Sequence, residues 1–328
     1  MKILVIFTGG TIGSSLQEEW VSLDGSTGKT LINNYLTKFG NDVKFDVFTP
    51  YSILSENLTG NEISILIKCV NEYSKKDYDG IIVTHGTDTI QYSAAALTYT
   101  LEKKNFPVVV VSANYPLDSI KSNGDANFEA AVAFIKEKAG NGVYVSYKNS
   151  TKNITSFHYG TRLLAHMETF DDLYSINCEA YAYYDNGKIV LNNDFTPVES
   201  INPIGNIELC PEPEILVINS HPGDSFHYDL ARYKAVIISP YHSSTINTAN
   251  KKLVEFCEYA TKIGIPIFVV NLRSEFIYES SKLFEELSLI KLPLCCFAAI
   301  YIKLWFAISC RENIVNFMLT PLSGEFLN

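Results

Sequence analysis

The hydrophobic positions of this chain form short apolar runs separated by segments of helical spacing. Apolar runs rich in β-branched residues predict buried strands, and alternation over 43–48 predicts one more. The predicted strands of the first half are 2–7, 43–48, 80–84, 108–111 and 142–147. Apolar residues spaced three and four apart predict helices at 30–39, 62–73, 90–101 and 128–136. This alternation predicts a flavodoxin-like α/β fold, a mostly parallel sheet with helices on both faces.

The second half predicts a smaller α/β unit. Strands are expected at 215–218, 235–238 and 266–270, and helices at 249–261, 279–287 and 298–309. Residues between about 148 and 210 are less regular and rich in turn residues. We therefore predict an N-terminal domain over 1–190, a linker over 191–212 and a C-terminal domain over 213–328.

The first predicted strand ends in Thr8-Gly9-Gly10-Thr11-Ile12-Gly13. Open α/β sheets place their chemistry at the carboxyl ends of strands, and glycines let the backbone approach a ligand there. A dinucleotide-binding turn is disfavoured because the first glycine of that motif and its later acidic residue are missing. A plain tight turn needs no function and stays open for this stretch alone.

A second strand end, His85-Gly86-Thr87-Asp88-Thr89, carries similar groups. A threonine hydroxyl is a poor nucleophile unless a neighbour takes its proton, and glycine-rich turns supply donors for an oxyanion. Thr11, Thr87 and Asp88 therefore form a candidate acyl-transfer site. The alternative is a helix cap, in which oxygens of Asp88 and Thr89 accept backbone N–H groups. We expect His85 to hydrogen-bond the local backbone.

Together, the two stretches resemble the paired motifs of the bacterial L-asparaginase family. The resemblance implies an amidohydrolase with a larger N-terminal and a smaller C-terminal domain, a homodimer or homotetramer, with neither a metal nor an organic cofactor. The resemblance implies that Thr11 is the nucleophile. It also implies that Thr87 is the second threonine of the site and that Asp88 binds the substrate's ammonium group. The expected reaction converts L-asparagine, and in some members L-glutamine, to the acid and ammonia.

The stretch 51–59 resembles the family's substrate loop. The resemblance implies that Ser55 and Glu56 hold the α-carboxylate and the α-amino group of the substrate. The chemistry agrees, because Glu56 and Asp88 suit an ammonium, and Ser55 suits a carboxylate. We expect Gly10, Gly86 and Thr87 to help stabilise the oxyanion.

Two positions depart from the family pattern. The family lysine that activates the second threonine corresponds to Ala165, in a strand predicted to begin at Gly160, where His166 would face the opposite side. The family's lid tyrosine is also missing from residues 14–31, where Trp20 is the sole aromatic residue. A general base contributes about 10²–10⁴-fold in rate. The sequence therefore leaves open a different base, slow turnover, or a protein that binds an amino acid without hydrolysing it.

The composition excludes several classes of binding partner and of structural site. The formal net charge of −10 argues against nucleic acid or an anionic membrane surface. The seven cysteines are scattered and form no C-x-x-C pair, which suits a reducing cytoplasm and suggests neither a disulfide framework nor a zinc site. We expect no signal peptide, and we expect the apolar stretch 292–308, interrupted by Pro293 and Lys303, to be buried rather than membrane-spanning.

Two strand ends of the second half also carry polar residues. The stretch 221–224 (HPGD) is interpreted as a turn. The loop 240–245 lies where the family uses a glycine-rich loop to reach a neighbouring subunit, but it contains no glycine. We favour a simple loop before a helix, and the alternative is that His242 and Thr245 contact substrate across an interface.

Overall fold

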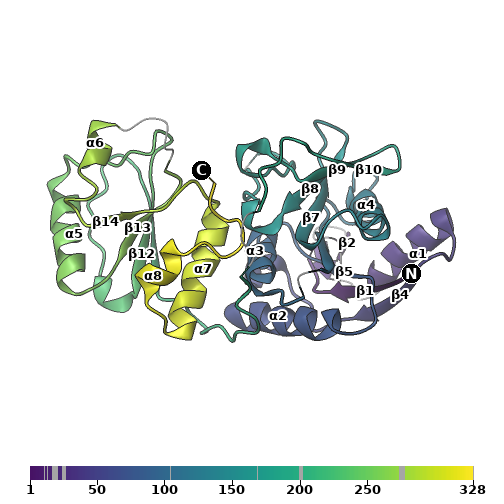
Figure 1. Cartoon of the computed structure of the whole chain (residues 1–328). Coiled ribbons are helices and arrows are strands. Elements are labelled where there is room, and N and C mark those ends of the chain that lie inside the picture. The colour runs from purple at the N-terminus through teal and green to yellow at the C-terminus, as the bar shows by residue number, and fades with distance from the viewer. Residues whose placement is uncertain are drawn as a thin grey trace.

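The computed structural model describes residues 1–10, 12, 14–16, 21–23, 27–103, 105–167, 169–198, 202–272 and 278–327. These residues form an eight-stranded sheet, a four-stranded sheet and a two-stranded hairpin. Figure 1 shows the two larger sheets side by side, each with its helices, the one formed by the N-terminal half being the larger. The predicted fold class is confirmed.

The larger sheet has the strand order β10-β9-β8-β7-β6-β5-β1-β4. Its parallel part contains β1 (Lys2–Phe7), β4 (Lys44–Phe48), β5 (Gly80–Thr84), β6 (Pro107–Val111) and β7 (Gly142–Lys148). Three antiparallel strands extend it, namely β8 (Thr155–Tyr159), β9 (Ala182–Asp185) and β10 (Lys188–Leu191). The strand β8 escaped prediction because it buries polar residues such as Ser156 and His158, which gives it no apolar run.

Helices cover both faces of this sheet, as predicted. They are α1 (Thr27–Phe39), α2 (Gly60–Ser74), α3 (Ile90–Thr100) and α4 (Gly124–Lys136). Side chains alternate along β1, because Leu4 and Ile6 belong to the core with α2 and α3, whereas Ile3 and Val5 belong to the core with α1 and α4. The central strands β1, β5 and β6 are therefore buried on both sides, which is why they are almost continuously apolar.

The smaller sheet is parallel throughout. Its strands are β11 (Ile215–Asn219), β12 (Ala235–Ser239), β13 (Ile267–Val269) and β14 (Leu289–Lys291). The helices of this half are α5 (Lys251–Lys262), α6 (Glu279–Lys282), α7 (Phe297–Cys310) and α8 (Ile314–Leu319). The helix predicted over 279–287 is shorter than expected, and β14 and α8 were not predicted.

The helix α7 lies between the two sheets (Figure 1). One of its faces, with Ile302 and Phe306, joins the core of the larger sheet, and another, with Ile300 and Leu304, joins the core of the smaller one. This two-sided burial explains the apolar stretch 292–308. Within the described ranges no helix is both long and apolar enough to span a bilayer.

The remaining elements are short. A hairpin of β2 (Ser14–Leu16) and β3 (Val21–Leu23) follows the first glycine turn. Four 3₁₀ turns are described, η2 (Ser55–Asn57), η3 (Gly160–Arg162), η4 (Ile176–Cys178) and η5 (Leu230–Arg232). The strand predicted to begin at Gly160 is wrong, because a 3₁₀ turn stands there and the following residues make a single bridge, between Leu163 and Ser175.

The physical reason for that turn is the chain that packs on it. The Thr161 hydroxyl donates to the backbone oxygen of Ser323 at 2.8 Å, and Arg162 Nε donates to that of Gly324 at 2.9 Å. These groups bind the C-terminal segment, which returns to the larger sheet. The domain boundaries at 190 and 212 stay a prediction.

Candidate active site

The first and second predicted loops leave the sheet at the same level. The strands β1 and β5 are parallel neighbours, and Phe7 lies opposite Thr84. The substrate loop joins them, because the Gly10 N–H donates to the Ile53 oxygen at 2.9 Å and the Ile53 N–H donates to the Thr8 oxygen at 3.1 Å. Three segments that are far apart in the sequence therefore meet at one edge of the sheet.

The contact between the two glycine turns is a contact between backbones. Gly10 has a φ of +77°, and a Cβ added to it would lie 2.3 Å from the nitrogen of Gly86. A Cβ on Gly86 would lie 2.4 Å from the Ser55 hydroxyl oxygen. Only glycine satisfies both positions, since no side chain fits into either space.

Polar side chains of two of these loops are joined to each other. The Ser55 hydroxyl donates to Asp88 Oδ2 at 3.3 Å, and the Thr89 hydroxyl donates to the Ser55 carbonyl at 2.9 Å. Ser55 is buried, Thr87 is half-buried, and both Asp88 and Glu56 are exposed. The site therefore presents two carboxylates to solvent above a buried hydroxyl.

The helix-cap alternative is confirmed in position but not in its hydrogen bond. Thr89 is the N-cap residue of α3, but its side chain makes no capping hydrogen bond. Its hydroxyl points instead to the substrate loop. Asp88 and Thr89 therefore bind Ser55 of the substrate loop to the start of α3.

His85 is buried beneath this edge and bonds locally, as predicted. Its Nδ1 lies 2.9 Å from the Gly86 carbonyl, and its Nε2 lies 2.8 Å from the Ser93 hydroxyl. Burial lowers the pKa of His85, so the ring is neutral, with Nδ1–H donating to the carbonyl and Nε2 accepting from Ser93. The side chain fixes the Gly86 backbone to α3.

The predicted site residues divide into two groups. The structure brings together Gly10, Ser55, Gly86 and Asp88, with Glu56 and Thr87 beside them in the same loops. Thr11 and Trp20 lie outside the described residues, so the assignment of the nucleophile stays a prediction. The roles of the others in substrate binding and catalysis stay predictions too, and the Gly10 N–H is engaged by Ile53 in this structure.

Comparison with known proteins identifies the family. The family described as Asparaginase, N-terminal matches residues 2–197. This chain belongs to the asparaginase family. The match includes every described loop of the candidate site.

Solved asparaginase structures share the whole fold. The thermostable L-asparaginase from Thermococcus kodakarensis superposes with a TM-score of 0.83 at 22% sequence identity, covering 100% of both chains. L-asparaginase I from Vibrio cholerae O1 biovar eltor str. N16961 gives a TM-score of 0.81 at 22% identity, covering 100% of this chain and 99% of that one. These likenesses establish the fold.

Sequence relatives carry a different name. A glutamyl-tRNA(Gln) amidotransferase subunit of Metallosphaera sedula is 25% identical over 344 residues, covering 99% of this chain and 76% of that protein. The protein of the same name from Pyrobaculum aerophilum is 30% identical over 187 residues, covering 56% of this chain and 44% of that protein. The family is thus established, whereas the activity named differs between the sequence relatives and the solved structures.

The position of the asparaginase-family lysine is occupied differently here. Ala165 is exposed in the loop that follows η3, and it contributes neither charge nor base. The next residue, His166, is half-buried and packs its ring against that of Tyr147, with centroids 5.3 Å apart. Because this segment is a 3₁₀ turn and a loop, the alternation of a strand, which would turn Ala165 and His166 to opposite sides, does not apply here.

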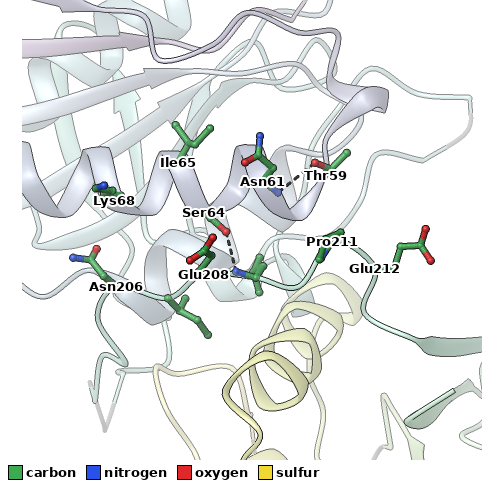
Figure 2. A pocket seen from close by; sticks show the side chains of 11 residues that line it. Thr59, Asn61, Ser64, Ile65, Lys68, Asn206, Glu208, Pro211 and Glu212 are labelled. Atoms are coloured by element: carbon green, nitrogen blue, oxygen red, sulfur yellow. Dashed lines mark hydrogen bonds between the residues drawn. The ribbon is translucent and has the colours of Figure 1, made fainter.

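A groove of about 890 Å³ lies between α2 and the segment 206–212, next to Thr59 at the end of the substrate loop (Figure 2). Its floor is fixed by the Leu209 N–H, which donates to the Ser64 hydroxyl at 2.9 Å. Polar side chains of both segments line it, among them Asn61, Lys68 and Glu208. None of the predicted site residues is among those that line this groove.

The carboxyl edge of the smaller sheet is built more simply. His221 Nδ1 lies 2.9 Å from the Asn219 carbonyl, and the chain turns at Pro222 and Gly223, as predicted. The loop 240–245 closes on itself, because the Tyr241 N–H donates to the Thr245 oxygen at 2.9 Å. Whether His242 and Thr245 reach a neighbouring subunit stays a prediction.

Proposed function

We propose that this asparaginase-family protein hydrolyses the side-chain amide of L-asparagine to L-aspartate and ammonia. The observation that carries the proposal is the meeting of three loops at one sheet edge, with Gly10 against Gly86 and Ser55 bonded to Asp88. An amino-acid amide needs groups for an ammonium, a carboxylate and a developing oxyanion. These three loops offer all of them within one site.

Each residue has a part in the proposed reaction. Thr11 attacks the amide carbon, ammonia leaves, and a water then releases the acyl group from the threonine. Gly86 and Thr87 stabilise the oxyanion, whereas Gly10, whose N–H is bonded to Ile53, holds the substrate loop in place. The exposed carboxylates of Glu56 and Asp88 bind the substrate's ammonium group, and Ser55 binds its α-carboxylate. No cofactor takes part in this scheme.

The test is ammonia release from L-asparagine by the purified protein, with Thr11→Ala as the matched control. We expect release by the wild type and a loss of about 10⁴-fold or more in the variant, because the acyl-enzyme cannot form. Equal release by both proteins would contradict a threonine nucleophile. Size-exclusion chromatography of the same sample tests the proposed homodimer or homotetramer, and localisation to the cytoplasm is part of the proposal.

A second candidate is an amino-acid-binding protein that does not hydrolyse its ligand. Ala165 favours it, because the exposed alanine supplies no base at a position where the family resemblance implies one. In that case asparagine or aspartate raises the melting temperature, and no ammonia appears. The same two measurements therefore separate the candidates.

A third candidate follows from the relatives whose name is that of a glutamyl-tRNA(Gln) amidotransferase subunit. A subunit of that kind belongs to an assembly that uses an amide as nitrogen donor. Glutamine and asparagine should be compared as substrates in the ammonia assay. A preference for asparagine with free ammonia as product supports the L-asparaginase proposal, and activity that appears only with a partner protein supports the amidotransferase role.

A further inference from the structure

The groove between α2 and the segment 206–212 has two antiparallel walls. The Asn71 Nδ2 donates to Asn206 Oδ1 at 3.1 Å, and the Leu209 N–H donates to the Ser64 hydroxyl at 2.9 Å. Residue numbers therefore rise along one wall where they fall along the other. These two bonds fix the spacing of the walls, so the groove is preformed, as binding sites for small ligands usually are.

The end of the groove beside the substrate loop is fixed as well. The Thr59 hydroxyl accepts from the Asn61 N–H at 3.3 Å, and Glu62 Oε2 accepts from the Thr59 N–H at 3.1 Å. A Cβ on Gly60 would lie 2.8 Å from the Cys210 oxygen. The start of α2 is therefore held against the opposite wall at this end too.

The charged side chains of the groove are separated by sign along its length. Lys68 lies at one end and Glu212 at the other, with Glu208 between them (Figure 2). Within the part of the chain that the structure describes, none of these three side chains forms an ion pair. A ligand with an ammonium group at the Glu212 end and a carboxylate at the Lys68 end would pair with both.

Apolar side chains lie between these two ends. Ile65 and Ile207 are half-buried, Leu209 is buried, and all three line the groove. From Asn61 to Lys68 the helix α2 rises by about 10 Å, which is the length of about three residues of an extended chain. The groove therefore suits a ligand that is apolar in the middle and charged at both ends.

The wall 206–209 also has backbone groups that a peptide can use. Its side chains alternate, with Asn206 and Glu208 exposed, Ile207 half-buried and Leu209 buried, which is the pattern of an extended chain. Among the described residues, the N–H groups of Ile207 and Glu208 donate no hydrogen bond. An extended peptide can pair with such groups as an added strand.

We propose that this groove is a binding site for a short, extended peptide with free ends, whose ammonium lies at Glu212 and whose carboxylate lies at Lys68. A free amino acid carries both charged groups on one carbon atom, so it cannot reach both ends. The site is separate from the candidate active site, since none of the predicted site residues lines the groove. It does not depend on the proposed function.

The test is an NMR titration of the protein with the tripeptide Ala-Leu-Ala at about 50 mM salt, because salt screens exposed charge pairs. We expect saturable binding with a Kd below about 1 mM, and no competition by free alanine. N-terminal acetylation and C-terminal amidation each remove one charge and should weaken binding by about three- to fivefold. A titration that shows no saturation at about 10 mM tripeptide overturns the proposal.

Two variants test the place and the direction of the peptide. Lys68→Gln should weaken binding of the free tripeptide by about three- to fivefold but leave that of the amidated one unchanged, because the partner charge is already gone. Glu212→Gln should act in the same way on the free and the acetylated tripeptide. Both side chains are exposed, so the fold should tolerate the changes. Lys251→Gln, at an exposed lysine of α5, is the matched control and should leave every affinity unchanged.

A last variant separates the groove from the candidate active site. Asp88→Asn should leave tripeptide binding unchanged, because Asp88 does not line the groove. If Asp88→Asn weakens binding and Lys68→Gln does not, the peptide occupies the candidate active site and the proposal is overturned. These measurements need no turnover, so ammonia release tests the proposed function and tripeptide binding tests the groove.

Discussion

The carboxyl edges of the two parallel sheets differ in how closely their loops approach. At the edge of the larger sheet, Gly10 has a φ of +77° and a Cβ on it would lie 2.3 Å from the Gly86 nitrogen. At the edge of the smaller sheet, Gly223 has a φ of +79° and has nothing within 4 Å of the same position. The backbone conformation is the same, but only the first glycine joins two loops.

The histidines of the two halves of the chain also differ, in their burial. His85 and His158 are buried and His166 is half-buried in the N-terminal half, whereas His221, His227 and His242 are all exposed. A parallel sheet edge is thus only a place where a site can form. The site itself requires loops that are pressed together, as they are at Gly10 and Gly86.

The largest expected effect is the loss of stability when the glycine at each sheet edge is replaced by alanine. Gly10→Ala places a methyl group inside the Gly86 backbone and should destabilise the protein by roughly 2–5 kcal/mol, the sum of left-handed strain and overpacking. Gly223→Ala is the matched control, and it should cost about 1–2 kcal/mol because only the strain applies. Urea unfolding measures both, and equal losses would show that the close approach of Gly10 and Gly86 is not tight in solution.

The next effect concerns pH. Burial lowers the pKa of His158 to about 3, and an unfolded histidine titrates near 6.5. The unfolded chain therefore binds one more proton between these values, and the free energy of unfolding should fall by about 1.4 kcal/mol per unit as pH decreases through this window. Burial of His85 acts in the same direction.

The matched variants for that prediction are His158→Asn and His227→Asn. The first should reduce the slope of stability against pH by about 1.4 kcal/mol per unit, because its proton no longer contributes. The second changes an exposed ring of the other half and should leave the slope as it is. Urea unfolding at several pH values between 4 and 7 gives the slopes, and parallel changes in both variants would refute the assignment to burial.

The smallest expected effect is a change in KM when a serine hydroxyl is removed at the carboxyl edge of each sheet. Ser55→Ala removes the hydroxyl that is proposed to bind the substrate's α-carboxylate, and a loss of about 1 kcal/mol corresponds to a roughly fivefold rise in KM. Ser220→Ala removes a buried hydroxyl that follows β11 and has no partner among the described residues. It should leave KM unchanged. A rise in KM for both variants would place the smaller sheet's edge in the site as well.

Much of the fold followed from the sequence because buried parallel strands are continuously apolar. The strand β5 has its predicted bounds, Gly80–Thr84, and β1 was predicted over its full length, Lys2–Phe7. The strand β8 was missed because its buried side chains include hydroxyls and a histidine, which satisfy hydrogen bonds that no pattern of single residues reveals. The strand predicted at Gly160 failed because groups from the C-terminal segment bind Thr161 and Arg162 there.

For the candidate site, the sequence alone determined which residue types stand at which strand ends: glycines, hydroxyls and carboxylates at Gly10, Ser55, Gly86 and Asp88. These are local features, written in consecutive residues. Only the tertiary structure decided that Gly10 contacts Gly86, that the Thr89 hydroxyl binds the substrate loop, and that His166 lies in a loop and not in a strand. Each of these depends on how distant segments pack, since the direction of a loop side chain is set by its neighbours in space and not by its neighbours in the chain.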